Sequence, residues 1–166
     1  MTNLSLVLQH AAADHGERPA VYLNGRVLSY SRLWDAAGRM TSLLWSLGIG
    51  PGDRVAVMLP NVPAFPVAFY GALAAGAVVV PVNPLLKSRE VAYYLRDSGA
   101  TVLLAWHTAA DEAGKAAAET GAQVIEISES GLSALLADFA PVPEGVQRAD
   151  DDGAVILYTS GTTGRA

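Results

Sequence analysis

The chain has 166 residues, of which 51% are apolar and 16% charged, with a formal net charge of -5 and no cysteine. This length and balance suit one globular domain with a sizeable core and argue against disorder. An acidic chain without clustered lysine and arginine gives no reason to expect a nucleic-acid partner, and the absence of cysteine excludes both a disulfide framework and a thiolate metal site.

The first elements predicted along the chain are a tight hairpin and an amphipathic helix. Asn24 and Gly25 lie between two short runs rich in Val, Leu and Tyr, which is typical of a two-residue turn with positive φ at both positions. From Ser31 onward, apolar residues recur at steps of three and four until Gly48, which indicates one apolar helix face. An antiparallel hairpin and a helix therefore open the fold.

From residue 53 onward, apolar strand-like runs alternate with helical patterns. Strands are predicted over 53–60, 77–83, 101–106, 122–128 and 154–160, and helices over 63–76, 88–99, 109–121 and 131–140. Ser88 is the expected cap of the second of these helices. The alternation predicts an α/β fold, with a mainly parallel sheet that carries helices on both faces.

One segment raises the question of a membrane span. No charged residue occurs between Arg54 and Lys87, as in a transmembrane helix. Five prolines interrupt this segment, and its helical pattern gives way to a strand pattern near Gly76. The first 20 residues also lack the basic and long apolar stretches of a secretory signal. We therefore expect an interior helix and strand, no membrane span, and a cytoplasmic location.

The stretch YTSGTTGRA, residues 158–166, combines hydroxyl side chains and glycines directly after the last predicted strand. Parallel sheets bind ligands beyond the carboxyl ends of their strands, and glycines let a backbone curl around an anion. The nucleoside-triphosphate loop G-x-x-x-x-G-K-[ST] does not match, because only two residues separate the glycines and Arg165 follows them. These residues alone leave open a phosphate loop and a surface turn without a ligand.

Taken in order, ILYTSGTTGR resembles the phosphate-loop signature of the adenylate-forming, or AMP-binding, superfamily. The segments LSYSRLWDAAGRM, LGIGPGDRVAVMLPN, YGALAAGAVVVPVNP and REVAYYLRDSGATVLL resemble, in order and spacing, N-terminal blocks of the same superfamily. The resemblance covers most of residues 28–165, and residues 83–107 are most similar to bacterial long-chain fatty-acid or acyl-CoA ligases. Ala166 stands where many members have proline. The resemblance implies that residues 1–166 are an incomplete N-terminal adenylation domain that ends inside the phosphate loop.

The activity implied by the resemblance is a two-step ligation. A small-molecule carboxylate would react with ATP and Mg²⁺ to give an acyl-adenylate, and coenzyme A would then accept the acyl group. By resemblance, the residues that would hold the β- and γ-phosphates are Thr159, Ser160, Gly161, Thr162, Thr163 and Gly164. No catalytic residue is assigned within 1–166, and we expect this stretch alone to be inactive. Two alternatives remain: a nonribosomal-peptide-type adenylation domain, and a stand-alone nucleotide- or partner-binding module without catalysis.

Three further features admit both a structural and a functional interpretation. The carboxylates of 150–152 precede an apolar run, where a solvated turn is commoner than a metal site. Phe65, Phe69 and Tyr70 fall on helical spacing, which favours the core over an acyl pocket. Asn83 follows a predicted strand and precedes a proline, so it suits an ordinary turn as well as a site.

Overall fold

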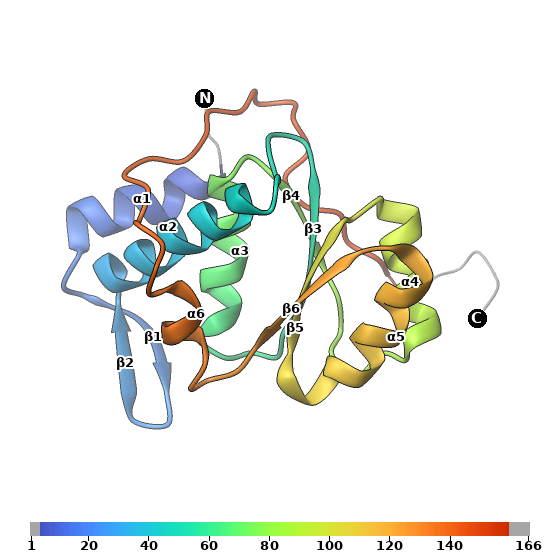
Figure 1. Cartoon of the computed structure of the whole chain (residues 1–166). Coiled ribbons are helices and arrows are strands. Elements are labelled where there is room, and N and C mark those ends of the chain that lie inside the picture. Colours follow the sequence, from blue (N-terminus) through green and yellow to red (C-terminus); the bar gives the residue numbers. More distant parts are fainter. Residues whose placement is uncertain (1–3, 160–166) are drawn as a thin grey trace.

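The computed structural model describes residues 4–159. Its elements are α1 (Leu4–His15), β1 (Pro19–Leu23), β2 (Arg26–Ser29), α2 (Tyr30–Ser46), β3 (Arg54–Met58), α3 (Ala64–Ala74), β4 (Val78–Pro81), α4 (Ser88–Ser98), β5 (Val102–Trp106), a 3-10 turn η1 (His107–Ala109), α5 (Ala110–Thr120), β6 (Gln123–Ile127) and α6 (Leu132–Leu136). Figure 1 shows them along the chain. The predicted alternation of strands and helices is confirmed.

The strands form two separate sheets. β1 and β2 make an antiparallel hairpin, with Asn24 at φ 50° and Gly25 at φ 76°, so the predicted turn is confirmed. The larger sheet is parallel and has the order β4-β3-β5-β6. The chain therefore moves outward from β3 to β4 and then returns to the other side of β3.

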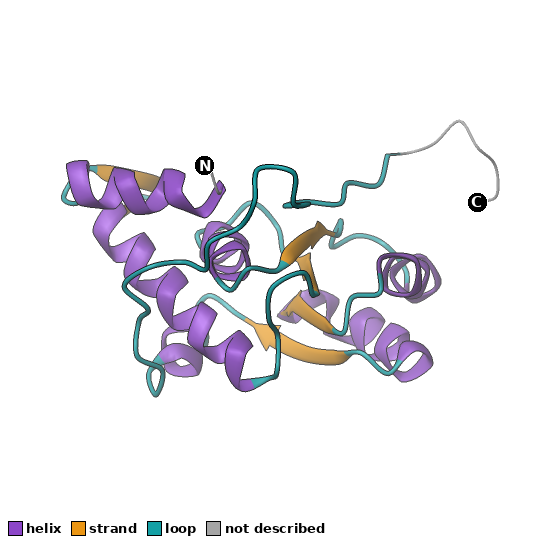
Figure 2. Ribbon diagram, turned by 90° about the horizontal axis from the view of Figure 1, so that it is seen from above, coloured by secondary structure: helices purple, strands orange, loops and turns teal. Residues whose placement is uncertain are grey.

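Helices cover both faces of the parallel sheet, as predicted (Figures 1 and 2). Alternate residues of β3 face opposite ways: Val55 and Val57 belong to one apolar cluster, and Ala56 and Met58 to another. The first cluster includes residues of α1, α2, α3 and α6, whereas the second includes residues of α4 and α5. Because both faces are buried, the strands are nearly continuous runs of apolar residues.

Helices α2 and α3 approach each other closely at Gly71. A Cβ placed on Gly71 would lie 2.6 Å from Met40 Cγ and 2.9 Å from the carbonyl oxygen of Ala37. The buried hydroxyl of Thr41 lies 2.9 Å from the carbonyl oxygen of Gly71, to which it donates a hydrogen bond. Because Gly71 has no side chain, the two helix backbones can approach each other. The approach brings the Thr41 hydroxyl within hydrogen-bonding distance of the Gly71 carbonyl.

The uncharged segment forms β3, α3 and β4, as expected. Val55, Ala68 and Val79 in these three elements are completely buried. Within residues 4–159, no helix has both the length and the apolar composition needed to cross a membrane.

Two parts of the predicted chain order are wrong. α1 was not predicted, because its apolar residues do not gather into a strong stripe along the helix, although Leu8 is buried. The strand expected over 154–160 is reduced, among the described residues, to one parallel bridge between Val79 and Val155. Val79 N–H donates to the Ala154 carbonyl and Ile156 N–H donates to the Val79 carbonyl, each at 2.9 Å. The next donor on that side of β4 would be residue 81, a proline without an N–H group, so the ladder stops.

Candidate functional site

The residues predicted to bind phosphate begin at Thr159. Thr159 is exposed, and the other five, Ser160, Gly161, Thr162, Thr163 and Gly164, lie outside the described residues. The structure therefore places only the approach to the predicted loop.

That approach follows α4 instead of continuing along the sheet edge. After the bridge at Val155, the ring of Tyr158 stacks on that of Tyr94, with centroids 4.1 Å apart and an angle of 18° between the planes. The Tyr158 hydroxyl donates a 2.6 Å hydrogen bond to Oδ2 of Asp97, the penultimate residue of α4. In Figure 1 the last described residues pass beside α4. Sequence reasoning placed this segment in a strand and gave Tyr158 no partner.

The surroundings of the Tyr158 hydroxyl favour its protonated form. Burial raises the pKa of Tyr158 above its ordinary value of 10, and the hydrogen bond to the negatively charged Asp97 raises it further. A phenol with a pKa of 10 or more is protonated at neutral pH, so the Tyr158 hydroxyl can donate to Asp97.

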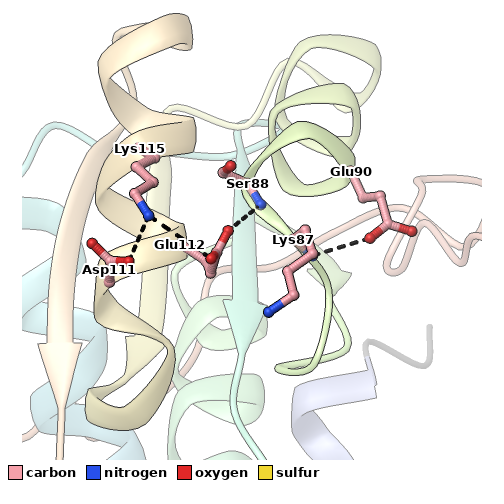
Figure 3. Close-up of polar contacts among 6 residues, drawn as sticks. All are labelled: Lys87, Ser88, Glu90, Asp111, Glu112 and Lys115. Carbon is pink, nitrogen blue, oxygen red and sulfur yellow. Dashed lines mark hydrogen bonds and ion pairs between the residues drawn. The ribbon is translucent and has the colours of Figure 1, made fainter.

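The start of α4 is another place where an anion could bind, because helix N-termini present free N–H groups at the carboxyl edge of a parallel sheet. Here carboxylates of the protein take those positions (Figure 3): Lys87 N–H donates to Glu90 at 3.0 Å, and Ser88 N–H donates to Glu112 of α5 at 2.7 Å. The expected cap is thus wrong, because Lys87 is the capping residue and Ser88 is the first helical one. Glu112 could not be found as a partner from local spacing.

The bond from Ser88 fixes the charge state of Glu112. Donation by the Ser88 backbone N–H holds the pKa of the Glu112 carboxyl below its ordinary value of 4.5, with a smaller contribution from Lys115. Lys115 Nζ lies 2.6 Å from Asp111 Oδ2 and 3.9 Å from Glu112 Oε1, and its hydrogen bond to Asp111 raises the pKa of its ammonium group. This cluster links α4 to α5 and makes the start of α4 a structural junction.

A polar hollow of about 590 Å³ lies at the carboxyl ends of β5 and β6. Its lining includes His107, Ser128 and, from the hairpin, Arg26, which pairs with Glu129 at 3.1 Å. Both partners are mostly exposed, at 82% and 64%, so the pair contributes little stability. This grouping was not predicted from the sequence. His107 directly follows the strand predicted over 101–106, and Ser128 is the last residue of the strand predicted over 122–128.

The remaining candidates take structural roles among the described residues. Asn83 Oδ1 accepts a 2.9 Å hydrogen bond from Leu85 N–H, which closes a turn. Asp152 accepts from Ala149 N–H at 2.8 Å and pairs with Arg148 at 3.2 Å. The rings of Phe65, Phe69 and Tyr70 pack against the first apolar cluster, as predicted.

Metal ligands are not gathered in the described part of the chain. Across residues 4–159, no three His, Asp or Glu side chains come together in a way that could hold a metal ion. Of the six residues that the resemblance assigns to the phosphates, the structure describes one, the exposed Thr159.

Comparison with known proteins shows the family. The model of the family described as AMP-binding enzyme matches residues 8–166, nearly the whole chain. The chain belongs to the AMP-binding enzyme family. This confirms the resemblance found in the sequence.

The long-chain-fatty-acid–CoA ligase FadD13 of Mycobacterium tuberculosis is 38% identical over 140 residues, and the match covers 82% of this chain and 28% of the relative. Feruloyl-CoA synthase of Amycolatopsis is 36% identical over 88% of this chain and 28% of its own length.

Solved structures of AMP-binding enzymes have the same fold. The N-terminal domain of FACL13 from Mycobacterium tuberculosis superposes with a TM-score of 0.85 at 32% identity, covering 96% of this chain and 42% of that one. A benzoate CoA ligase from Burkholderia xenovorans superposes with a TM-score of 0.88 at 28% identity, and the match covers 95% of this chain and 33% of the ligase. ATP-bound MatB from Rhodopseudomonas palustris superposes with a TM-score of 0.86 at 30% identity, and the match covers 98% of this chain and 33% of MatB. The chain thus spans less than half the length of each, and it corresponds to their N-terminal part.

Proposed function

We propose that this chain forms the N-terminal part of an ATP-dependent acyl-CoA synthetase that activates a carboxylic acid, in the first instance a long-chain fatty acid. The family match over residues 8–166 carries the proposal. The choice of acid is supported by the ligases for long-chain fatty acids among the relatives, at 38% and 35% identity. The relatives that act on ferulate and benzoate show how widely the acid varies within the family.

In this proposal the phosphate loop is Thr159–Gly164, and its task is to bind and orient. Hydroxyl and backbone N–H donors would meet the β- and γ-phosphates and later the departing pyrophosphate, where preorganised donors are most effective. ATP would supply the phosphoryl centre on which the carboxylate is activated, Mg²⁺ would offset negative charge, and coenzyme A would accept the acyl group. Among the described carboxylates at 150–152, Asp152 is already engaged by Ala149 and Arg148 and is therefore a poor candidate for Mg²⁺.

The test is ATP–pyrophosphate exchange that depends on an added carboxylate. The protein is expressed from its complete reading frame, with residues 1–166 alone beside it. We expect exchange to require a fatty acid and to be absent from residues 1–166 alone, because activation needs several groups acting on one phosphate centre.

A pair of glycine variants tests the loop. Gly164→Val should lower the exchange rate by about tenfold or more. The physical reason is that removal of one preorganised donor of this kind typically lowers the reaction rate roughly 10²-fold. Gly114→Val, in the middle of α5, is the matched control, because a Cβ there meets nothing within 4 Å. Equal exchange by both variants at the same folded fraction would refute the loop assignment.

A further inference from the structure

Beyond Ile156, which packs against the second apolar cluster, the side chain of Tyr158 attaches the approach to the predicted phosphate loop to the rest of the fold. Tyr158 stacks on Tyr94 at 4.1 Å, donates to Asp97 at 2.6 Å, and meets the ring of Tyr93 edge-on at 6.2 Å. Its two neighbours are turned to solvent: Leu157 is 71% exposed, and Thr159 is exposed as well. Between Ile156 and Thr159, the last described backbone hydrogen bond is the one from Ile156 to β4.

The partner of Tyr158 is a fixed surface. α4 buries Val91, Ala92 and Leu95 in the second apolar cluster, and its first turn is tied to α5 through Glu112. A side chain held on this helix therefore restricts where the following backbone can go. The two attachments are different in kind, since stacking needs the aromatic ring and the hydrogen bond needs the hydroxyl.

We propose that Tyr158 is a positioning residue, which fixes the backbone at Thr159 and thereby orients the start of the phosphate loop. The proposal rests on the proposed function for its ligand, and on the described contacts for its mechanism. A segment ordered before the ligand arrives loses less conformational freedom on binding, so its donors bind phosphate more tightly. Tyr158 acts through Thr159 and needs no contact of its own with the ligand.

The first measurement follows backbone motion by ¹⁵N relaxation in the 166-residue chain. We expect order parameters of about 0.8 for the amides of Tyr158 and Thr159, falling below about 0.6 in Tyr158→Ala. Tyr158→Phe, which keeps the ring and loses the hydroxyl, should lie between these values. Tyr22→Ala and Tyr22→Phe are the matched controls, because Tyr22 is 69% exposed on the hairpin. Unchanged order at Thr159 in Tyr158→Ala would overturn the proposal.

The second measurement is the affinity of the same chains for pyrophosphate, by titration at constant ionic strength. We expect Tyr158→Ala to bind about threefold to tenfold more weakly than the wild type, because ordering the segment then opposes binding. The midpoint of thermal unfolding should change no more than in Tyr22→Ala. Equal affinity of wild type and Tyr158→Ala would overturn the proposal. If the wild-type chain bound no pyrophosphate, the expected effect of Tyr158 on affinity would be refuted, and the order parameters would still decide whether Tyr158 holds the backbone. The loop assignment is decided separately, by the exchange assay on Gly164→Val.

Discussion

At the scale of single residues, Glu112 shows how a position that could bind a ligand can serve the fold. Its carboxylate accepts a hydrogen bond from the backbone N–H of Ser88, the first residue of α4. The negative charge and the N-terminal end of the helix therefore stabilise each other. The contact crosses 24 positions of the sequence. A pattern search within one helix cannot find such a partner, which is why Ser88 itself was the natural candidate for the cap.

Glu112→Gln should reduce stability in a way that depends on pH. Because the folded protein depresses the pKa of Glu112 below 4.5, its charge contributes stability above that pH and loses the contribution as pH falls through the folded pKa. The midpoint of thermal unfolding should therefore be lower in Glu112→Gln than in wild type at pH 7. The two midpoints should converge on acidification.

The neighbouring Asp111 supplies the control for this measurement. Asp111 is 78% exposed and its ion pair with Lys115 lies at the surface. Asp111→Asn should leave the midpoint near that of wild type at pH 7. A gap between wild type and Glu112→Gln that stays constant down to pH 3 would show that the Ser88 contact does not depend on charge.

At the scale of elements, the contact between α2 and α3 depends on the absence of one side chain. Gly71→Ala would place a methyl group 2.6 Å from Met40 Cγ and 2.9 Å from a backbone oxygen. We expect a loss of about 1–3 kcal/mol in the free energy of unfolding, since the helices must separate. Gly114→Ala in α5 should instead raise it by about 0.5–1 kcal/mol, because alanine restricts the unfolded chain and meets nothing in the folded one. Urea unfolding of both variants measures the difference, and equal effects would contradict this account.

Periodicity predicted most elements because the burial pattern of each is local. The strands of the parallel sheet are buried on both faces, and α2 has a clear apolar stripe, so both leave strong signals in the sequence. The last strand failed because its pairing depends on a proline in a distant partner, Pro81. For the candidate site, the order of hydroxyls and glycines predicts a phosphate loop, and this stays a prediction. The contact of Tyr158 with α4 joins segments 61 residues apart and leaves no local signal.

At the scale of the whole molecule, the two apolar clusters share one sheet. Leu44 is completely buried in the cluster on one face, and Leu95 is 2% exposed in the cluster on the other. Neither cluster can lose its packing without uncovering the strands that the other one needs. The described fold should therefore unfold as one cooperative unit.

Leucine truncations on the two faces test this cooperativity. Leu44→Ala and Leu95→Ala should each lower the free energy of unfolding by about 2–5 kcal/mol. In both variants, far-ultraviolet circular dichroism and tryptophan fluorescence should follow a single transition. Leu85→Ala is the control, because Leu85 is 82% exposed and its loss should change stability by at most about 0.5 kcal/mol. Separate transitions for the two probes in either core variant would show that the faces unfold independently.

The strand order β4-β3-β5-β6 also determines how the sheet can grow while the chain is being synthesised. Of the four strands of this sheet, β3 leaves the ribosome first. β4 then pairs with one edge of β3, β5 pairs with the other edge, and β6 pairs with the free edge of β5. Each new strand thus finds a neighbour that already exists, and none has to be inserted between two strands that have paired. The sheet can extend by addition at its edges, in the order in which a nascent chain presents its strands.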